Sequence, residues 1–282
     1  MTTHFDLLIG IDDTDNLDSK GTGFLSQRLL AELEAQGLGR ALGVTRHQLY
    51  VHPDIPYTSH NSSACIAWDG GPDPDVAGVI AAAGHFLQAE SAPGSDPGLV
   101  VATRRACADP AVTEALAIFG RRAKREVLSL SRAWELARNL GVHASGHGGT
   151  SGGIIGALAG VGLHLSGTDG LFLWMPGIRA LTGFTTYREL KESVPIDAAR
   201  DPAGIEPEPE DTIDLGDWVR PVLSGGRAVL LLEPRSIPIH DSTGSADSMG
   251  SAGTGDPAEP AAPEGRTGRT WGVAPKEIVK VH

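Results

Sequence analysis

The sequence predicts a mixed α/β fold of the α+β type, with a small β module at its C-terminal end. Two observations favour this class. Strand-like and helix-like apolar patterns alternate from residue 5 to residue 175, and after Val194 the composition changes to a stretch rich in proline and acidic residues. A chain of 282 residues is long enough for a sizeable core in one or two domains.

The expected elements follow from apolar periodicity and from the residues that interrupt it. Short apolar runs bounded by Gly, Pro or Asp predict strands, and four-residue spacing, as in Leu25, Leu29 and Leu33, predicts a helix. The predicted strands are residues 5–11, 41–51, 62–69, 98–103, 126–130 and 170–175, and the predicted helices are residues 23–37, 73–90, 109–124, 131–141 and about 153–165.

Helices and strands alternate most regularly between residues 62 and 131, which favours a ferredoxin-like α/β unit there. That unit is then an insertion that splits a surrounding domain into residues 1–61 and 132–195. A loop is expected over residues 142–153.

The remaining residues, 196–282, are expected to form an acidic linker and the small β module. The linker lies directly after Val194, and a hairpin is predicted around Gly225 and Gly226. Residues 241–268 contain almost no large apolar side chains, which predicts disorder. The segment from Thr270 is expected to return as a strand.

Composition excludes several classes of protein. The longest apolar stretch is broken by glycine and is shorter than the roughly 20 residues of a membrane span. The N-terminus has no signal-peptide pattern, and two cysteines make neither a disulfide framework nor a four-cysteine zinc site. We therefore expect a cytoplasmic protein without membrane contact.

The net charge of −12 argues against a general nucleic-acid surface, because phosphate neutralisation supplies most non-specific binding. The charge is uneven, since residues 101–140 carry eight basic and four acidic side chains. The basic segment 121–132 is therefore either a solvated helix face or a local surface for nucleic acid.

The densest chemical signal is the acidic turn after the first strand, GIDDTDNLDSKGTG. Asp12, Asp13 and Asp15 repel one another, and a divalent cation is the simplest compensation. Carboxylate oxygens suit Mg²⁺, which commonly binds one or two carboxylates together with substrate phosphates. The following Gly21-Thr22-Gly23 opens a helix, whose N-terminus favours an anion. The turn therefore predicts a phosphate-transfer site.

Other interpretations of this turn are open. Asp15, Asn16, Asp18 and Ser19 are also typical turn and helix-capping residues. An EF-hand starting at Asp13 requires Gly and Glu where Asp18 and Phe24 stand. A haloacid-dehalogenase pattern at Asp13 to Asp15 has Leu17 in place of the usual Thr or Val.

Two further loops are candidate binding segments. The glycine-rich residues 145–160 lead into a helix and would let backbone amides approach a phosphate, although they match neither the P-loop nor a dinucleotide fingerprint. Residues 53–65 gather polar side chains around His60, a possible acid or base near neutral pH. His143 and His147 lie in a loop, which does not favour a zinc site.

Three segments, in this order, resemble the N-terminal kinase and ferredoxin-like domains of the TiaS family, the archaeal tRNA(Ile) 2-agmatinylcytidine synthetases. They are GIDDTDN with GTGFL behind it, HPDIPYTSHNSSA, and GGTSGGIIGALAGVG, all within residues 6–195. The resemblance implies a truncated TiaS-like protein without the zinc ribbon. In that family, ATP and Mg²⁺ serve to phosphorylate the C2 carbonyl oxygen of an anticodon cytidine, and the amine of agmatine then displaces the phosphate.

The resemblance also implies residue roles. Asp12, Asp13 and Asp15 would hold the metal and the ATP phosphates, and Thr22 would be the phosphoacceptor or a phosphate contact. The expected cofactor-binding residues are Gly21, Gly23, Gly149, Thr150, Ser151, Gly152 and Gly153, and the expected substrate-binding residues are Tyr57, His60 and Asn61.

The chain departs from the family pattern where the family has basic residues. Residues 58–62 replace a Lys-Thr-Arg-Gly-Asn stretch, residues 149–153 lack an Asn and an Arg, and Gly21-Thr22-Gly23 replaces Cys-Thr-Thr. Loss of lysine and arginine weakens the grip on a phosphodiester. We therefore expect a nucleotide and a small-molecule amine or amide, rather than tRNA, as partners.

The sequence thus predicts an enzyme, an ATP- and Mg²⁺-dependent phosphotransferase or ligase that activates a carbonyl or similar oxygen of its substrate, with amine attack as a second step. Two alternatives stay open. One is tRNA cytidine modification by agmatine conjugation, and the other is a regulator that binds nucleotide without turnover.

Overall fold

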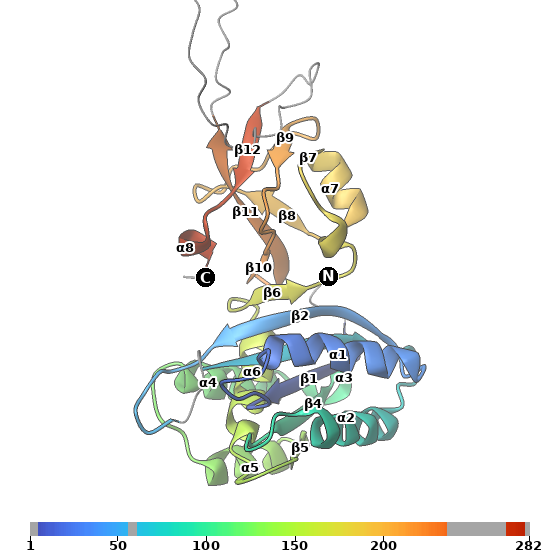
Figure 1. Cartoon of the computed structure of the whole chain (residues 1–282), viewed down its shortest axis with the longest axis vertical. Coiled ribbons are helices and arrows are strands. Elements are labelled where there is room, and N and C mark those ends of the chain that lie inside the picture. Colours follow the sequence, from blue (N-terminus) through green and yellow to red (C-terminus); the bar gives the residue numbers. More distant parts are fainter. Residues whose placement is uncertain (1–4, 56–60, 236–268, 280–282) are drawn as a thin grey trace, which may run out of the picture.

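The computed structural model describes residues 5–55, 61–235 and 269–279. Its N-terminal part is a ferredoxin-like βαββαβ unit (Figure 1). The elements are β1 (Leu7–Asp12), α1 (Thr22–Ala35), β2 (Arg40–Gln48), β3 (Ser62–Asp69), α2 (Val76–Glu90) and β4 (Gly98–Thr103). The strands pair antiparallel in the order β4-β1-β3-β2. The predicted α/β fold class is confirmed.

The structure corrects the expected boundaries of the ferredoxin-like unit. It begins at β1 rather than at residue 62, because β3 and β4 lie on either side of β1 in one sheet. Every residue of β1 from Leu7 to Ile11 is buried, so this strand needs neighbours on both edges and helices on both faces. The expected domain border between residues 61 and 62 therefore falls inside a continuous sheet.

Helices cover both faces of this sheet. Leu7, Ile9 and Ile11 pack under α1 and α2 on one face, and Leu8 packs under the helices of the other face. Those helices are α4 (Pro110–Ala123), α5 (Leu130–Asn139) and α6 (Gly153–Ser166). The short helix α3 (Arg104–Cys107) follows β4, and β5 (His143–Gly146) pairs with β4 at the sheet edge. The expected loop 142–153 thus contains a strand.

Helix α6 lies unusually close to β1. A Cβ atom at Gly10 would stand 2.3 Å from the carbonyl oxygen of Ala157 and 2.9 Å from a methyl carbon of Val161. The carbonyl oxygen of Ala157 belongs to the helix backbone, so it cannot rotate away as a flexible side chain could. The bare backbone of Gly10 therefore sets the distance between the helix and the strand.

Replacing Gly10 with Ala is expected to lower the free energy of unfolding by about 1–3 kcal/mol, the usual cost of overpacking a core. Urea unfolding monitored by circular dichroism measures this change. Gly43→Ala on β2 is the control, because its nearest neighbour is the ring of Phe172 at 3.2 Å, a side chain that has room to adjust. Equal effects of the two substitutions would contradict this account of the packing.

The predicted strand 126–130 is wrong. Ser129 is the N-cap residue of α5, and its carbonyl oxygen accepts the N–H groups of Arg132 and Ala133. Glu126 and Val127 are exposed and have no strand to pair with among the described residues. The helix therefore begins within the apolar run, and the residues before it form a turn.

The C-terminal module joins the sheet through β6 (Leu171–Trp174), which pairs with β2 and with β10 (Figure 1). The predicted hairpin is confirmed, since Ser224 and Arg227 face each other across Gly225 and Gly226. The other elements are η1 (Ile178–Ala180), β7 (Phe184–Thr186), α7 (Tyr187–Ser193), β8 (Ala198–Arg200), β9 (Thr212–Asp214), β10 (Val222–Ser224), β11 (Arg227–Arg235), β12 (Thr270–Val273) and α8 (Lys276–Val279).

The module starts earlier than the expected residue 196, because Tyr187 and Leu190 pack in the same core as Trp271. The expected linker is also structured. It contributes β8 and β9, and buried Asp211 accepts hydrogen bonds from the indole N–H of Trp271 at 2.9 Å and the backbone N–H of Arg269 at 2.7 Å. The predicted disordered segment 241–268 lies outside the described residues.

Among the residues that the structure describes, no helix combines the length and the hydropathy that a membrane span requires.

Candidate functional site

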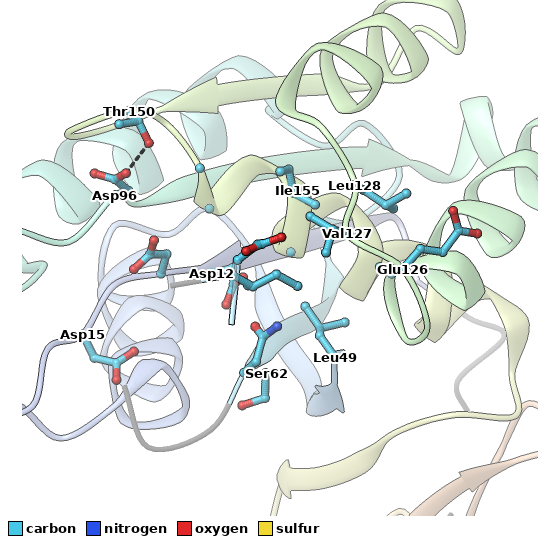
Figure 2. Close-up of a pocket in the computed structure, with 18 residues that line it drawn as sticks. Asp12, Asp15, Leu49, Ser62, Asp96, Glu126, Val127, Leu128, Thr150 and Ile155 are labelled. Atoms are coloured by element: carbon cyan, nitrogen blue, oxygen red, sulfur yellow. Dashed lines mark hydrogen bonds between the residues drawn. The ribbon is translucent and has the colours of Figure 1, made fainter. Parts of the chain in front are cut away.

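A pocket of about 210 Å³ opens where β1 ends, beside the N-terminal end of α6. Its wall combines the acidic turn, the loop before α6, the facing ends of β2 and β3, and the turn between α4 and α5 (Figure 2). The lining residues are Asp12, Asp13, Asp15, Leu49, Asp54, Ile55, Asn61, Ser62, Asp96, Ala123, Glu126, Val127, Leu128, Thr150, Gly152, Gly153, Ile155 and Gly156.

The pocket has an acidic part and an apolar part. Figure 2 shows Asp12 between the two, with Asp15 and Asp96 to one side of it and Val127 and Leu128 to the other. Six lining residues are carboxylates, and among the described lining residues none is Lys or Arg. The lining therefore repels a negatively charged ligand unless a cation accompanies it.

Asp12 ends β1 on the face that α6 covers. Its carboxylate lies on the helix backbone, because a Cβ atom at Gly156 would stand 1.7 Å from Asp12 Oδ2. Burial raises the pKa of Asp12 to about 8, and the neighbouring charges of Asp13 and Asp15 act in the same direction. Burial therefore favours the protonated form of this carboxyl group, and a cation beside it would favour the carboxylate.

Asp13 has a left-handed backbone, with φ at 52°. Asp and Asn adopt this conformation more readily than most residues, so the turn favours the residue type that the site uses. Burial raises the pKa of Asp13, and the charges of Asp96 and Asp15 act in the same direction. Two adjacent carboxyl groups of this pocket thus resist ionisation.

Asp15 holds the hydroxyl of Thr22. Thr22 Oγ1 donates to Asp15 Oδ1 at 2.8 Å and accepts a hydrogen bond from Thr14 Oγ1 at 3.1 Å. Thr22 is buried in the first turn of α1 and does not line the pocket. Gly21, the N-cap residue with φ at 76°, and Gly23 also lie outside the lining. The predicted roles of these three residues stay predictions.

The donor set fits a hard cation. No group of three or more His, Cys, Asp or Glu side chains in the described part of the chain is arranged to enclose a metal ion. Mg²⁺, however, typically takes one or two protein carboxylates and completes its shell with water and phosphate oxygens. Asp12 and Asp13 supply such carboxylates, and burial together with neighbouring acidic groups raises the pKa of both, so a cation beside them would favour their charged form.

The glycine-rich loop contributes Thr150, Gly152 and Gly153 to the lining, whereas Gly149 and Ser151 lie outside it. Thr150 Oγ1 donates a hydrogen bond to Asp96, which the dashed line in Figure 2 marks. The backbone N–H of Gly153 donates to the carbonyl oxygen of Asp96 at 3.0 Å. This N–H group is therefore engaged, and the helix dipole remains as a source of attraction for an anion.

Hydrogen bonds between strands fix the opposite wall. Asn61 lines the pocket, and its side-chain Nδ2 donates to the carbonyl oxygen of Tyr50 at 2.6 Å. The N–H of Tyr50 in turn donates to the carbonyl oxygen of Ala123 at the end of α4. Tyr57 and His60, the other expected substrate-binding residues, lie outside the described residues.

A buried polar chain ties the same wall to the core. Lys124, next to Ala123, forms an ion pair with Asp169, which accepts a hydrogen bond from His47 Nδ1 at 2.9 Å. Thr45 Oγ1 contacts His47 Nε2 at 2.8 Å and His164 Nδ1 at 2.9 Å. Burial would raise the pKa of Asp169, but the hydrogen bonds and charges of His47 and Lys124 hold it below its ordinary value.

This chain predicts a loss of stability in acid. Burial lowers the pKa of His164 to about 3, and the charge of His47 adds to the effect, whereas an unfolded histidine titrates near 6.5. The unfolded state therefore binds the extra proton first, and His164 is expected to lower the free energy of unfolding by about 1.4 kcal/mol per pH unit as the pH falls from 6.5 to about 3. Urea titrations at several pH values measure this slope.

His164→Asn keeps a donor toward Thr45 and is expected to remove its share of the slope. His85→Asn, at an exposed position, is the control for loss of a histidine. A slope that is the same in wild type and His164→Asn would contradict the assignment of this proton to His164.

Sequence reasoning missed several lining residues. Asp96 precedes Pro97 in the loop before β4, and nothing in its sequence context indicates a site. Only the folded structure brings it to the pocket beside the acidic turn. Leu49, Val127 and Leu128 have the apolar side chains typical of core residues.

His143 and His147 flank Ser145 at β5, where both Nε2 atoms contact Ser145 Oγ, at 3.0 Å and 2.8 Å respectively.

No protein-family model matches this chain, and no curated protein matches it. Solved structures do. The likeness is to TiaS. The complex of TiaS with an isoleucine tRNA and ATP matches with a TM-score of 0.47 and 23% identity, over 56% of this chain and 36% of that chain. A tRNA fluorescent labeling enzyme gives a TM-score of 0.47 and 24% identity, over 55% and 35%.

The apo form of TiaS, described as an agmatidine synthetase for the same tRNA, gives a TM-score of 0.46 and 23% identity, over 55% of this chain and 35% of that chain. The present chain therefore spans about a third of the TiaS chains that it matches. These structures concern proteins whose partner is tRNA. They overturn the expectation that a small-molecule amine or amide, rather than tRNA, is the partner, and we correct it here.

Proposed function

We propose that this chain binds ATP with Mg²⁺ in the pocket at the end of β1 and uses it to modify a cytidine of tRNA with an amine. One observation carries the proposal. Asp12, Asp13 and Asp15 converge beside an apolar wall at the N-terminal end of a helix, which is an arrangement for a polyphosphate, its cation and a base.

The electrostatics explain why the cation is needed. ATP carries several negative charges, and six carboxylates line the pocket. Mg²⁺ would supply the positive charge between the phosphates and the carboxylates and would withdraw charge from the transferred phosphoryl group. Asp12 and Asp13 are the residues to hold it. Chelation of Mg²⁺ is therefore expected to abolish ATP binding as well as turnover.

The apolar wall supplies the other half of the recognition. Leu49, Val127, Leu128 and Ile155 surround a space that suits the flat face of a nucleobase. Asp15 accepts the proton of the Thr22 hydroxyl in its hydrogen bond, so it is placed to take that proton if Thr22 receives a phosphoryl group. This step would phosphorylate the protein before, or instead of, the RNA.

We propose tRNA as the substrate because tRNA is the partner named in the similar structures. One similar structure is a complex of TiaS with tRNA and ATP, and another is a complex of TiaS with tRNA, the ATP analogue AMPCPP and agmatine. Because the present chain spans about a third of those chains, their activity comes to it as a proposal.

ATP turnover tests the proposal. Purified protein is incubated with ATP and Mg²⁺, with and without an unmodified tRNA transcript, and phosphate release is measured. We expect turnover that requires Mg²⁺ and rises with tRNA. Mass spectrometry of the protein reports phosphate on Thr22. Turnover that persists in excess chelator, or no turnover with tRNA and amine present, would contradict the proposal.

A further inference from the structure

We infer that Arg125 and Arg132, which lie in the chain on either side of the lining residues Glu126, Val127 and Leu128, form the docking surface for the single-stranded segment of the RNA substrate. The inference rests on the proposed function and adds to it a binding surface. The basic residues at the end of α4, in the turn that follows and at the start of α5 differ in whether they form ion pairs.

Five cations lie between residues 121 and 132, and three of them are neutralised. Arg121 pairs with Glu114 at 2.6 Å, and Arg122 pairs with Glu126 at 2.9 Å. Lys124 is held by Asp169. The other two, Arg125 and Arg132, are exposed and form no ion pair within the part of the chain that the structure describes. Neither guanidinium group is held in an ion pair there, although the charge of Arg132 helps to lower the pKa of Glu126.

Their place in the chain brings them to the pocket. Glu126, Val127 and Leu128, which directly follow Arg125, line it, and Figure 2 shows these three on one turn at its edge. The side chain of Val127 is apolar yet 45% exposed. A strand whose phosphates contact Arg125 and Arg132 would therefore have a base beside Val127, at the entrance of the apolar part.

The charge pattern favours a polyanion. Arginine recognises phosphate with paired hydrogen bonds, which suits a nucleotide chain. The excess of basic residues between 101 and 140 contrasts with the net charge of −12 for the whole chain, although Arg104 and Lys124 are paired with Asp6 and Asp169. A polyanion is therefore repelled less at this surface than by the chain as a whole.

A single strand fits better than a duplex. A base enters a pocket only after it has left its stack, and unpaired loops offer such bases. The acidic interior of the pocket would repel a phosphate that followed the base inward, so the backbone stays at the rim. The surface therefore holds the strand at the rim, with one unpaired base at the pocket entrance beside the bound ATP.

The test measures binding of a fluorescein-labelled RNA hairpin with a cytidine in its single-stranded loop, by fluorescence anisotropy at several salt concentrations. The variant carries Arg125→Gln and Arg132→Gln. The control carries Arg28→Gln and Arg188→Gln. These two exposed arginines lie on α1 and α7, and their substitution removes the same amount of positive charge. ATP turnover without RNA is measured in all three proteins.

We expect the variant to bind the hairpin at least about tenfold more weakly at low salt. The slope of log Kd against log salt should fall by roughly 1.4, that is about 0.7 for each of two phosphate contacts. RNA-independent turnover and the control protein should match wild type.

Equal binding by variant and control would overturn the docking surface and leave the proposed function standing. No hairpin binding by wild type would overturn both the surface and the RNA half of the proposed function. Displacement of the hairpin by polyglutamate of equal charge as readily as by unlabelled RNA would show a general anion surface and overturn the inference.

Discussion

Asp13→Asn is expected to lower Mg²⁺-dependent ATP turnover by at least about 100-fold, the size of loss that follows removal of one group that stabilises transition-state charge. The substitution is mild for the backbone, because Asn also tolerates the left-handed conformation that Asp13 adopts at φ 52°. It removes a charge that burial and Asp96 disfavour, so the folded state is not weakened. Steady-state phosphate release measures the effect, and thermal unfolding monitors the fold.

Asp18→Asn is the matched control. Asp18 lies in the same acidic turn, but it is exposed and does not line the pocket. Its substitution is expected to leave turnover within about twofold of wild type, since exposed charges of this kind contribute little. If the two variants lose activity equally, the turn acts through its overall charge, and the assignment of metal binding to Asp13 is wrong.

Gly156→Ala is expected to reduce turnover by about 10- to 100-fold through Asp12. The new Cβ atom would stand 1.7 Å from Asp12 Oδ2, so the carboxylate has to move away from its place at the end of β1. A displacement of about 1 Å in a catalytic group is enough for losses of this order. Alanine is otherwise the better helix former by about 1 kcal/mol, so simple destabilisation of α6 is not the expected cause.

Gly152→Ala separates this effect from a general intolerance of the loop. At Gly152 the nearest atom to a new Cβ is Thr150 Oγ1 at 3.4 Å, which is ordinary contact. We expect this variant to keep most of its turnover and its affinity for Mg²⁺, measured by calorimetry with an ATP analogue. Full activity of Gly156→Ala would show that the position of the Asp12 carboxylate does not matter.

The local elements could be predicted from the sequence because they depend on local patterns. The strand 62–69 and the helix that begins at Gly153 follow from apolar runs and their glycine borders. The order of strands could not be predicted in this way. β1 lies between β3 and β4, which are distant from it in the chain, and pairing over such separations leaves no periodic signal.

The candidate site likewise has a part that the sequence predicts and a part that depends on contacts between distant residues. The acidic turn could be recognised in the sequence, because like charges at adjacent positions repel one another and destabilise the fold unless a function requires them. Asp96 and Gly156 come to the pocket only through the packing of α6 on β1 and β4. Val127 and Leu128 belonged to a predicted strand, and the cap of α5 at Ser129 instead turned them toward the pocket.

The most direct test of the central claim follows the product. An unmodified tRNA transcript is incubated with the protein, ATP, Mg²⁺ and agmatine, digested to nucleosides and analysed by mass spectrometry. The account predicts a cytidine that has gained agmatine with loss of water, in wild type and not in Asp13→Asn. ATP turnover without any modified nucleoside, or a modified nucleoside formed equally by Asp13→Asn, would contradict it.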